Sequence, residues 1–174
     1  TDTSVYVKFK VKGKENTHLV IWTTTPWSLP SNTGVMVHPK LEYADVKMSN
    51  GERWIVAQER VEQLMSAIEA GYTVEKKFPG KELEGWEYEH PLAQQLDLPE
   101  LKNAYRVILN SRYVHVEEGS GLVHTAPGAG KEDYDAAKQG GLPTISMVGL
   151  DGTFDATGGK YAGKKARIVD TEII

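Results

Sequence analysis

Short runs of alternating or β-branched apolar residues recur along this chain, and Gly, Pro and Asn turn signals separate them. Val5, Val7, Phe9 and Val11 alternate with polar residues, as in a strand with one buried face. The same reasoning predicts further strands, all of them short. The predicted strands cover residues 5–11, 18–25, 34–38, 42–48, 53–57, 72–78, 105–109, 113–116, 122–125, 144–148 and 166–170.

Only two stretches have the period of a helix. Val61, Leu64, Met65 and Ile68 lie at the i, i+3, i+4 and i+7 positions of one face, and Gly71 is a candidate C-terminal cap. Residues 131–139 predict a second, short helix, and the Gly- and Pro-rich stretch 79–100 predicts a surface excursion. We therefore expect an α+β fold in which many short strands form a β-barrel-like core with a few flanking helices.

Composition excludes several classes of function. The chain has no Cys, so disulfides and Cys-based zinc sites are excluded, and its five His residues show no metal-binding spacing. A net charge of −4 is not that of a self-sufficient nucleic-acid binder. No apolar run approaches the roughly 18 residues that a membrane span needs. We expect no cofactor, no metal, no membrane partner and a cytoplasmic setting. The chain lacks an initiator Met, so we interpret its 174 residues as a single domain excised from a longer protein.

Two segments carry polar groups that could form a site. In WTTTPWSLPSN (residues 22–32), three threonines end a predicted strand, and two prolines stiffen the loop that follows. In HTAPGAGKEDY (residues 124–134), a predicted strand ends at His124, a Gly-rich turn follows, and acidic residues open a helix. Residue types alone favour ordinary roles for both segments, as strand and turn chemistry in the first and as helix N-terminal acids in the second.

The two segments together resemble a known pair. In this order, WTTTPWSLPSN and GLVHTAPGAGKEDY resemble the two signature stretches of the editing domain of isoleucyl-tRNA synthetase. The related valyl and leucyl enzymes usually have TTRP where this chain has TTTPW. The stretch FPGKELEGWEYEHPL (residues 78–92) is also similar to the family, so the resemblance covers most of the chain. It implies an editing domain, an insertion in the class I catalytic core.

The resemblance also implies roles for individual residues. His124 matches the wall of the amino-acid pocket, and Asp133 matches the acid that binds the free α-ammonium group of the substrate. The remaining positions contact the substrate or line the pocket, and we expect Thr25, His124 and Asp133 to be catalytic. The substrate-contacting and pocket-lining residues are Thr23, Thr24, Thr25, Trp27, Ser28 and Asn32.

Two positions depart from the usual family pattern. Ser28 stands where Thr is common, which keeps the hydroxyl, and Ala129 stands where many bacterial members have a second His. The second departure leaves any role of that His in doubt here. The ATP-site signatures HIGH and KMSKS are both missing from the chain, so we expect no amino-acid activation.

The resemblance predicts a hydrolase that removes valine from mischarged valyl-tRNA(Ile). Whether it also hydrolyses valyl-adenylate is left open by the sequence. Its expected partners are the aminoacylated 3′ end of tRNA(Ile), the valine moiety and the remainder of the synthetase chain. Two alternatives stay open. One is a catalytically silent tRNA-binding or spacer module of a synthetase. The other is an unrelated β-barrel that binds a sugar or a nucleotide.

Overall fold

The structure is a computed structural model that describes residues 5–23, 28–29, 32–69, 71–90, 104–114, 119–126 and 131–142. Within this part of the chain, strands dominate and two α-helices lie outside the sheet. In chain order the elements are β1 (Val5–Lys10), β2 (Thr17–Thr23), β3 (Gly34–Val37), β4 (Glu42–Met48), β5 (Arg53–Ala57), α1 (Gln58–Ile68), β6 (Tyr72–Pro79), the 3-10 helix η2 (Gly80–Leu83), β7 (Arg106–Leu109), β8 (Leu122–Thr125) and α2 (Lys131–Gly140).

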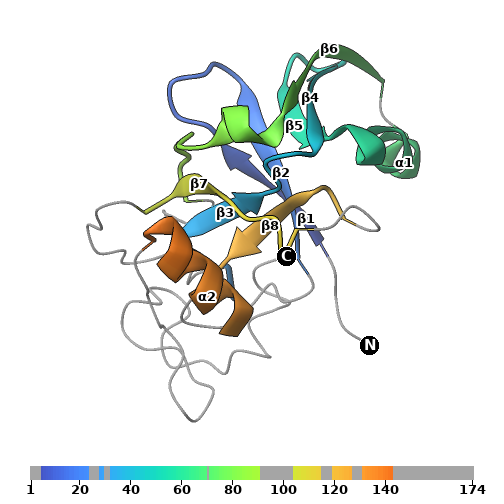
Figure 1. Cartoon of the computed structure of the whole chain (residues 1–174). Coiled ribbons are helices and arrows are strands. Elements are labelled where there is room, and N and C mark those ends of the chain that lie inside the picture. The colour runs from blue at the N-terminus through green and yellow to red at the C-terminus, as the bar shows by residue number, and fades with distance from the viewer. Residues whose placement is uncertain are drawn as a thin grey trace.

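All eight described strands belong to one curled sheet, in the order β6-β4-β5-β2-β8-β3-β7 with β1 paired to β2 (Figure 1). Strand β2 is the centre of this arrangement, because it pairs antiparallel with β1 and parallel with both β5 and β8. The β1–β2 register aligns Phe9 with Leu19, and both side chains are fully buried. The predicted barrel-like α+β fold is confirmed, as a half-barrel sheet with few helices.

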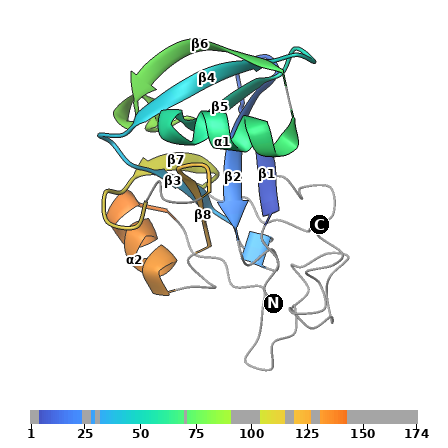
Figure 2. The same cartoon turned by 90° about the vertical axis from the view of Figure 1, so that its right-hand side faces the viewer.

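Each helix covers a different part of the outer face of the sheet, as Figures 1 and 2 show. Val61, Leu64 and Met65 of α1 pack on Val20 and Val56, so three residues of the predicted apolar stripe face the core, whereas the fourth, Ile68, is exposed. Helix α2 instead packs Ala136 and Ala137 against Met36 and Ile108. The inner face of the curl is filled by a separate cluster that includes Phe9, Leu19, Ile21, Tyr43, Ile55, Leu83, Tyr88 and Leu122.

Three local predictions were wrong. Helix α1 ends at Ile68 and is capped by Glu69 in a left-handed conformation (φ 53°), whose N–H bonds the carbonyls of the last turn, so Gly71 is not the cap. Residues 113–114 are not a strand, because the Asn110 side chain accepts the N–H groups of Arg112 and Tyr113 and turns the chain there. Residues 115–116 lie outside the described part of the chain, as do the strands expected at 144–148 and 166–170.

The third wrong prediction is the surface excursion at 79–100. Leu83 and Tyr88 are fully buried in the inner core, and Tyr88 pairs with Val11 through an isolated bridge. Residues 79–90 therefore close one side of the half-barrel through Leu83 and Tyr88, while Glu84 and Glu87 between them are exposed. The rest of that prediction, residues 91–100, lies outside the described residues.

Candidate functional site

The candidate site forms where β2 and β8 end and β3 begins. The register pairs Trp22 with Val123 and Val35 with His124, which places Thr23 beside His124 at neighbouring strand ends. The loop before β3 is tied to β8 by the Thr33 N–H, which donates to the Thr125 carbonyl at 3.0 Å. Two segments almost a hundred residues apart in sequence therefore share one corner of the sheet.

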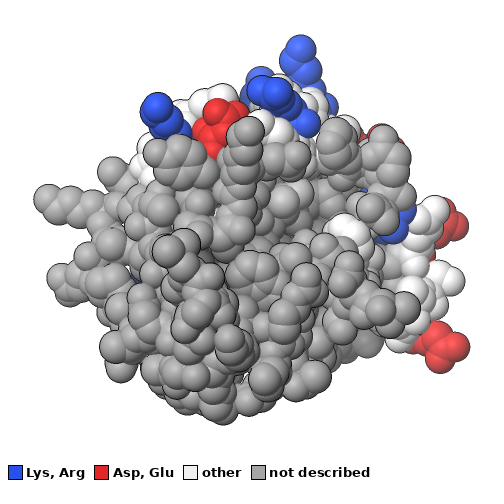
Figure 3. All heavy atoms as spheres, turned by 90° about the horizontal axis from the view of Figure 1, so that it is seen from below, with Lys and Arg blue, Asp and Glu red and all other residues white. Residues whose placement is uncertain are grey.

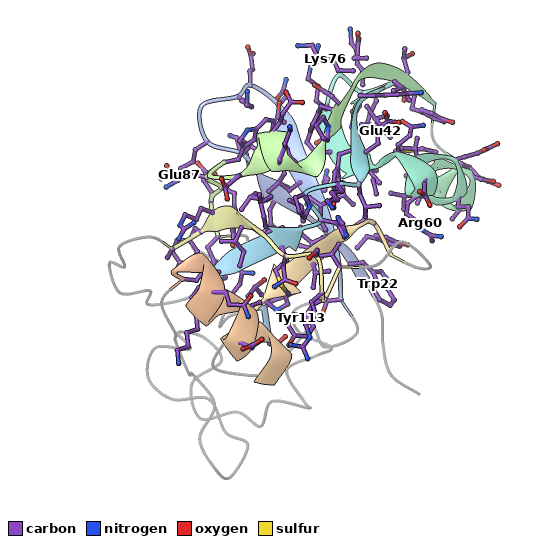
Figure 4. All side chains as sticks on the ribbon, in the orientation of Figure 1. Trp22, Glu42, Arg60, Lys76, Glu87 and Tyr113 are labelled. Carbon is purple, nitrogen blue, oxygen red and sulfur yellow. The ribbon has the colours of Figure 1, made fainter. Side chains whose placement is uncertain are left out.

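Strand alternation separates the two neighbouring residues at the end of β2. Thr23 is 6% exposed and shares the inward parity of Leu19 and Ile21. Trp22, labelled in Figure 4, faces the other side of the sheet, where a Cβ added at Gly119 would lie 3.0 Å from its indole ring. The Arg60 Nε of α1 donates to the Gly119 carbonyl at 2.8 Å and so lies on the same outer side. At this corner, therefore, Thr23 lies on the inner face of the sheet, and Trp22 and Arg60 lie on the outer face.

A chain of hydrogen bonds joins four polar side chains at this corner. Tyr88 donates its hydroxyl proton to Asn32 Oδ1. The Asn32 Nδ2 group lies 2.9 Å from the Gly34 carbonyl and 2.7 Å from His124 Nδ1. On the other side of the imidazole, His124 Nε2 lies 2.9 Å from Ser28 Oγ. The network therefore runs from Tyr88 through Asn32 and His124 to Ser28.

The partners in this network determine the protonation of His124. The Gly34 carbonyl can only accept, so the group of Asn32 that faces it must be the amide NH₂. The same NH₂ faces His124 Nδ1, which must therefore accept, and the imidazole proton lies on Nε2. His124 then donates to Ser28 Oγ, and each ring nitrogen has a defined partner.

Burial keeps His124 neutral. Its side chain is 5% exposed, and desolvation, followed by the nearby charge of His90, lowers its pKa to about 3. At neutral pH the imidazole ring is thus uncharged, and hydrogen bonds at both of its nitrogens hold it in place. Such a group can form a rigid wall and can position a hydroxyl, but it is poorly placed to exchange protons with solvent.

The structure brings together four of the residues that the sequence singled out. Thr23, Ser28, Asn32 and His124 lie at one corner, and all four are buried. Thr24, Thr25 and Trp27 lie outside the described residues, and so does Ala129. Asp133 belongs to the first turn of α2, but its side chain is outside the described part of the structure.

Sequence reasoning missed two residues that lie behind this corner. Tyr88 is fully buried and ends the hydrogen-bond chain, and His90 is 5% exposed and close enough to influence the pKa of His124. The ring of Tyr105 contacts both, with centroids 6.2 Å from Tyr88 and 5.5 Å from His90. The signal was present in WEYEHP, where Trp86, Tyr88 and His90 alternate with acidic residues as on one face of an extended segment.

The described residues offer no group of three acidic or histidine side chains that could hold a metal ion. Among the same residues, no helix is long and apolar enough to cross a membrane. In the face shown in Figure 3, both basic and acidic side chains are visible along the rim of the described part. The four members of the hydrogen-bond chain are uncharged, which sets the corner apart from this rim.

Comparison with known proteins gives consistent matches in sequence and in fold. No family model matches the chain. The chain is 43% identical to the isoleucine–tRNA ligase of Sulfolobus acidocaldarius over 99% of its own length, and 44% identical to that of Thermococcus kodakarensis. It spans only 17% of the length of each of these ligases.

Solved structures agree at the level of the fold. The editing domain of P. knowlesi cytosolic leucyl-tRNA synthetase matches 98% of this chain and 91% of its own, with a TM-score of 0.70 and 13% identity. The domain GlLeuRS-CP1 matches 98% of this chain and 93% of its own, with a TM-score of 0.72 and 12% identity. The chain is therefore homologous along its length to a segment of isoleucine–tRNA ligases, and it has the fold of a leucyl-tRNA synthetase editing domain.

Proposed function

We propose that the chain hydrolyses the ester bond between valine and the 3′ end of tRNA(Ile). The observation that carries this proposal is the fixed, neutral His124 beside Ser28 and Thr23, at a corner without charge among its described side chains. A rigid wall of this kind suits discrimination by size. The sequence match to isoleucine–tRNA ligases and the editing-domain fold support the same assignment.

The physical need for such a site follows from the amino acids concerned. Valine and isoleucine differ by one methylene, which contributes only about 1–3 kcal/mol of discrimination in an apolar pocket, and the isoleucyl enzyme is the standard illustration of this limit. A second pocket that admits the smaller side chain and excludes the larger one adds selectivity that the first pocket lacks. The His124 ring, held at both nitrogens, can act as the excluding surface.

The proposed chemistry is attack of water on the aminoacyl ester. Water adds to the ester carbonyl, the carbon–oxygen bond to the ribose breaks, and the ribose hydroxyl recovers a proton as valine is released. The carboxylate of Asp133 binds the α-ammonium group through charge-assisted hydrogen bonds, and the hydroxyls of Thr23, Thr24, Thr25 and Ser28 hold the ester and the water. Catalysis in this proposal comes mainly from positioning, because neutral His124 is a wall and not a proton carrier.

Release of valine from valyl-tRNA(Ile) by the synthetase that carries this segment tests the proposal. Asp133→Ala should lower the rate at least a hundredfold, whereas Asp135→Ala, an acid on the same helix that bonds Tyr113, should stay near the parent rate. His124→Ala should in addition admit isoleucyl-tRNA(Ile) to hydrolysis. A parent protein that binds tRNA without releasing valine would instead support a silent tRNA-binding module. Unchanged turnover in Asp133→Ala would contradict the anchoring role.

A further inference from the structure

Tyr88 has a geometry that its sequence position does not suggest. It lies outside both motifs, in the segment that follows η2, yet its hydroxyl reaches the same Asn32 side chain that contacts His124. The phenol is fully buried, and burial raises its pKa, so it keeps its proton and donates. The hydroxyl is therefore a permanent donor aimed at the amide of Asn32.

We propose that Tyr88 is a positioning residue that holds the Asn32 amide in one orientation and, through it, fixes the tautomer and the ring plane of His124. The amide of an asparagine can be turned by about 180°, which exchanges the positions of its carbonyl oxygen and its NH₂ group. With Tyr88 donating to Oδ1 and the Gly34 carbonyl accepting from Nδ2, both edges of Asn32 are used in one orientation. The NH₂ group then has only one place for its second proton, which is His124 Nδ1 at 2.7 Å.

The orientation of the Asn32 amide also sets the hydrogen bond between His124 and Ser28. Because Nδ1 accepts, His124 must donate from Nε2 to Ser28 Oγ, so the direction of every hydrogen bond in the chain follows from the Tyr88 hydroxyl and the Gly34 carbonyl. At metal sites, removal of a group that orients a ligand side chain typically costs about 10- to 100-fold in affinity or activity, and we expect an effect of this order here. Among the described residues, Asn32 is the motif residue to which the Tyr88 hydroxyl donates, so the effect of Tyr88 passes through positioning.

The structure provides a matched control for this inference. Tyr105 belongs to the same aromatic cluster, with its ring centroid 6.2 Å from that of Tyr88. Its hydroxyl is also buried, but it has no hydrogen-bond partner among the described residues. Tyr88→Phe and Tyr105→Phe therefore remove the same atom from the same cluster, and only the first breaks the chain that leads to His124.

The first measurement is nitrogen NMR of the His124 ring in the ¹⁵N-histidine-labelled chain, which distinguishes a protonated from an unprotonated ring nitrogen. The parent should show a protonated Nε2 and an unprotonated Nδ1. In Tyr88→Phe only the Gly34 carbonyl still holds the Asn32 amide, so the second tautomer should become populated and the two ¹⁵N shifts should move toward each other, whereas Tyr105→Phe should keep the parent pattern. Parent shifts retained in Tyr88→Phe would overturn the proposal.

The second measurement rests on the proposed function and uses valyl-tRNA(Ile) hydrolysis by the carrying synthetase. Tyr88→Phe should lower kcat about tenfold with little change in KM, because its proposed effect passes through Asn32 to His124, and Tyr105→Phe should stay within about twofold. Loss of kcat together with an equal rise in KM in both variants would indicate general loosening of the cluster and would overturn the positioning role. Absence of hydrolysis by the parent would refute the proposed function alone, since the NMR result stands by itself.

Discussion

The two ends of strand β2 place a histidine in opposite surroundings. Near its start, His18 lies beside Glu52, with its Nε2 3.6 Å from a carboxylate oxygen that also pairs with Lys8. Near its end, β2 lies next to His124 of β8, whose two ring nitrogens face an amide and a hydroxyl. The same sheet thus builds a charged, partly solvated cluster at one end and a neutral, buried network at the other.

The difference shows that the partners of a histidine, together with its burial, decide what the ring can do. Burial lowers the pKa of both rings, but at His18 the charge of Glu52 opposes that effect, while at His124 the nearby His90 reinforces it. The His18 Nδ1 atom is buried without a described hydrogen-bond partner, whereas each nitrogen of His124 is assigned one. Only the second arrangement fixes a tautomer, which is what a site that works by positioning needs.

The largest expected effect on stability comes from placing a charge in the buried network around His124, at the end of β2. Asn32→Asp replaces the NH₂ group that donates to the Gly34 carbonyl and to His124 Nδ1 by an acceptor, in a side chain that is fully buried. We expect a loss of about 3 kcal/mol or more in the free energy of unfolding, because buried acceptors are left facing one another. We also expect a raised His124 pKa, because a carboxylate beside Nδ1 favours the charged ring. Chemical denaturation and ¹⁵N NMR of the ring measure these two effects.

Asn110→Asp is the matched control for this substitution. Asn110 is also buried, but its Oδ1 accepts the N–H groups of Arg112 and Tyr113, and a carboxylate keeps both bonds. We expect it to cost less than about 1 kcal/mol, as is usual where no described partner is lost. Equal losses in the two variants would mean that burial alone, and not the direction of the hydrogen bonds, sets the cost.

A second prediction concerns acid. The folded pKa of His124 is about 3 and its ordinary value is 6.5, so between these two values the unfolded chain binds a proton that the folded chain does not. His124 therefore destabilises the fold as the pH falls below 6.5, by about 3 kcal/mol between pH 7 and pH 4. Chemical denaturation at each pH should show a shallower acid loss in His124→Gln than in the parent.

His18 sharpens this test because its pKa is shifted in the same direction. His18→Gln should remove a smaller part of the acid sensitivity than His124→Gln, since Glu52 partly offsets the effect of burial at His18. Parallel pH dependences for the parent and His124→Gln would show that the ring gains a proton in the folded state. That outcome would contradict its assignment as a neutral wall.

Much of the fold could be predicted because local patterns decide it. The Val5, Val7 and Phe9 alternation lies in β1, and the Val61, Leu64 and Met65 stripe faces the core. The errors arose where a side chain or a tertiary contact overrides the pattern. The Asn110 side chain turns the chain where the pattern predicts a strand. Tyr88 is buried in the core although the segment around it is rich in charged residues.

The candidate site shows the same limit more clearly. Ser28, Asn32 and His124 were predicted from two motifs, and their contact across the sheet depends on β3 and β8 pairing in the observed register. No spacing in the sequence predicts that register. Tyr88 was missed because a tyrosine among Glu87 and Glu89 looks like an exposed residue, and only the closure of the half-barrel turns it toward Asn32.

The smallest expected effect lies at the charged end of β2. Glu52→Gln removes the ion pair with Lys8, which is 3.0 Å long and partly exposed, while a glutamine carbonyl can still accept from Trp54 Nε1. We expect a loss of at most about 1 kcal/mol in the free energy of unfolding, shrinking as salt is added, because exposed ion pairs contribute little and are screened. The pKa of His18 should fall further, because Glu52 is the group that raises it against burial. A double-mutant cycle with Lys8→Met isolates the pair. A coupling of 3 kcal/mol that persists in high salt would make the charged end as integral to the fold as the His124 network, and the contrast between the two ends would fail.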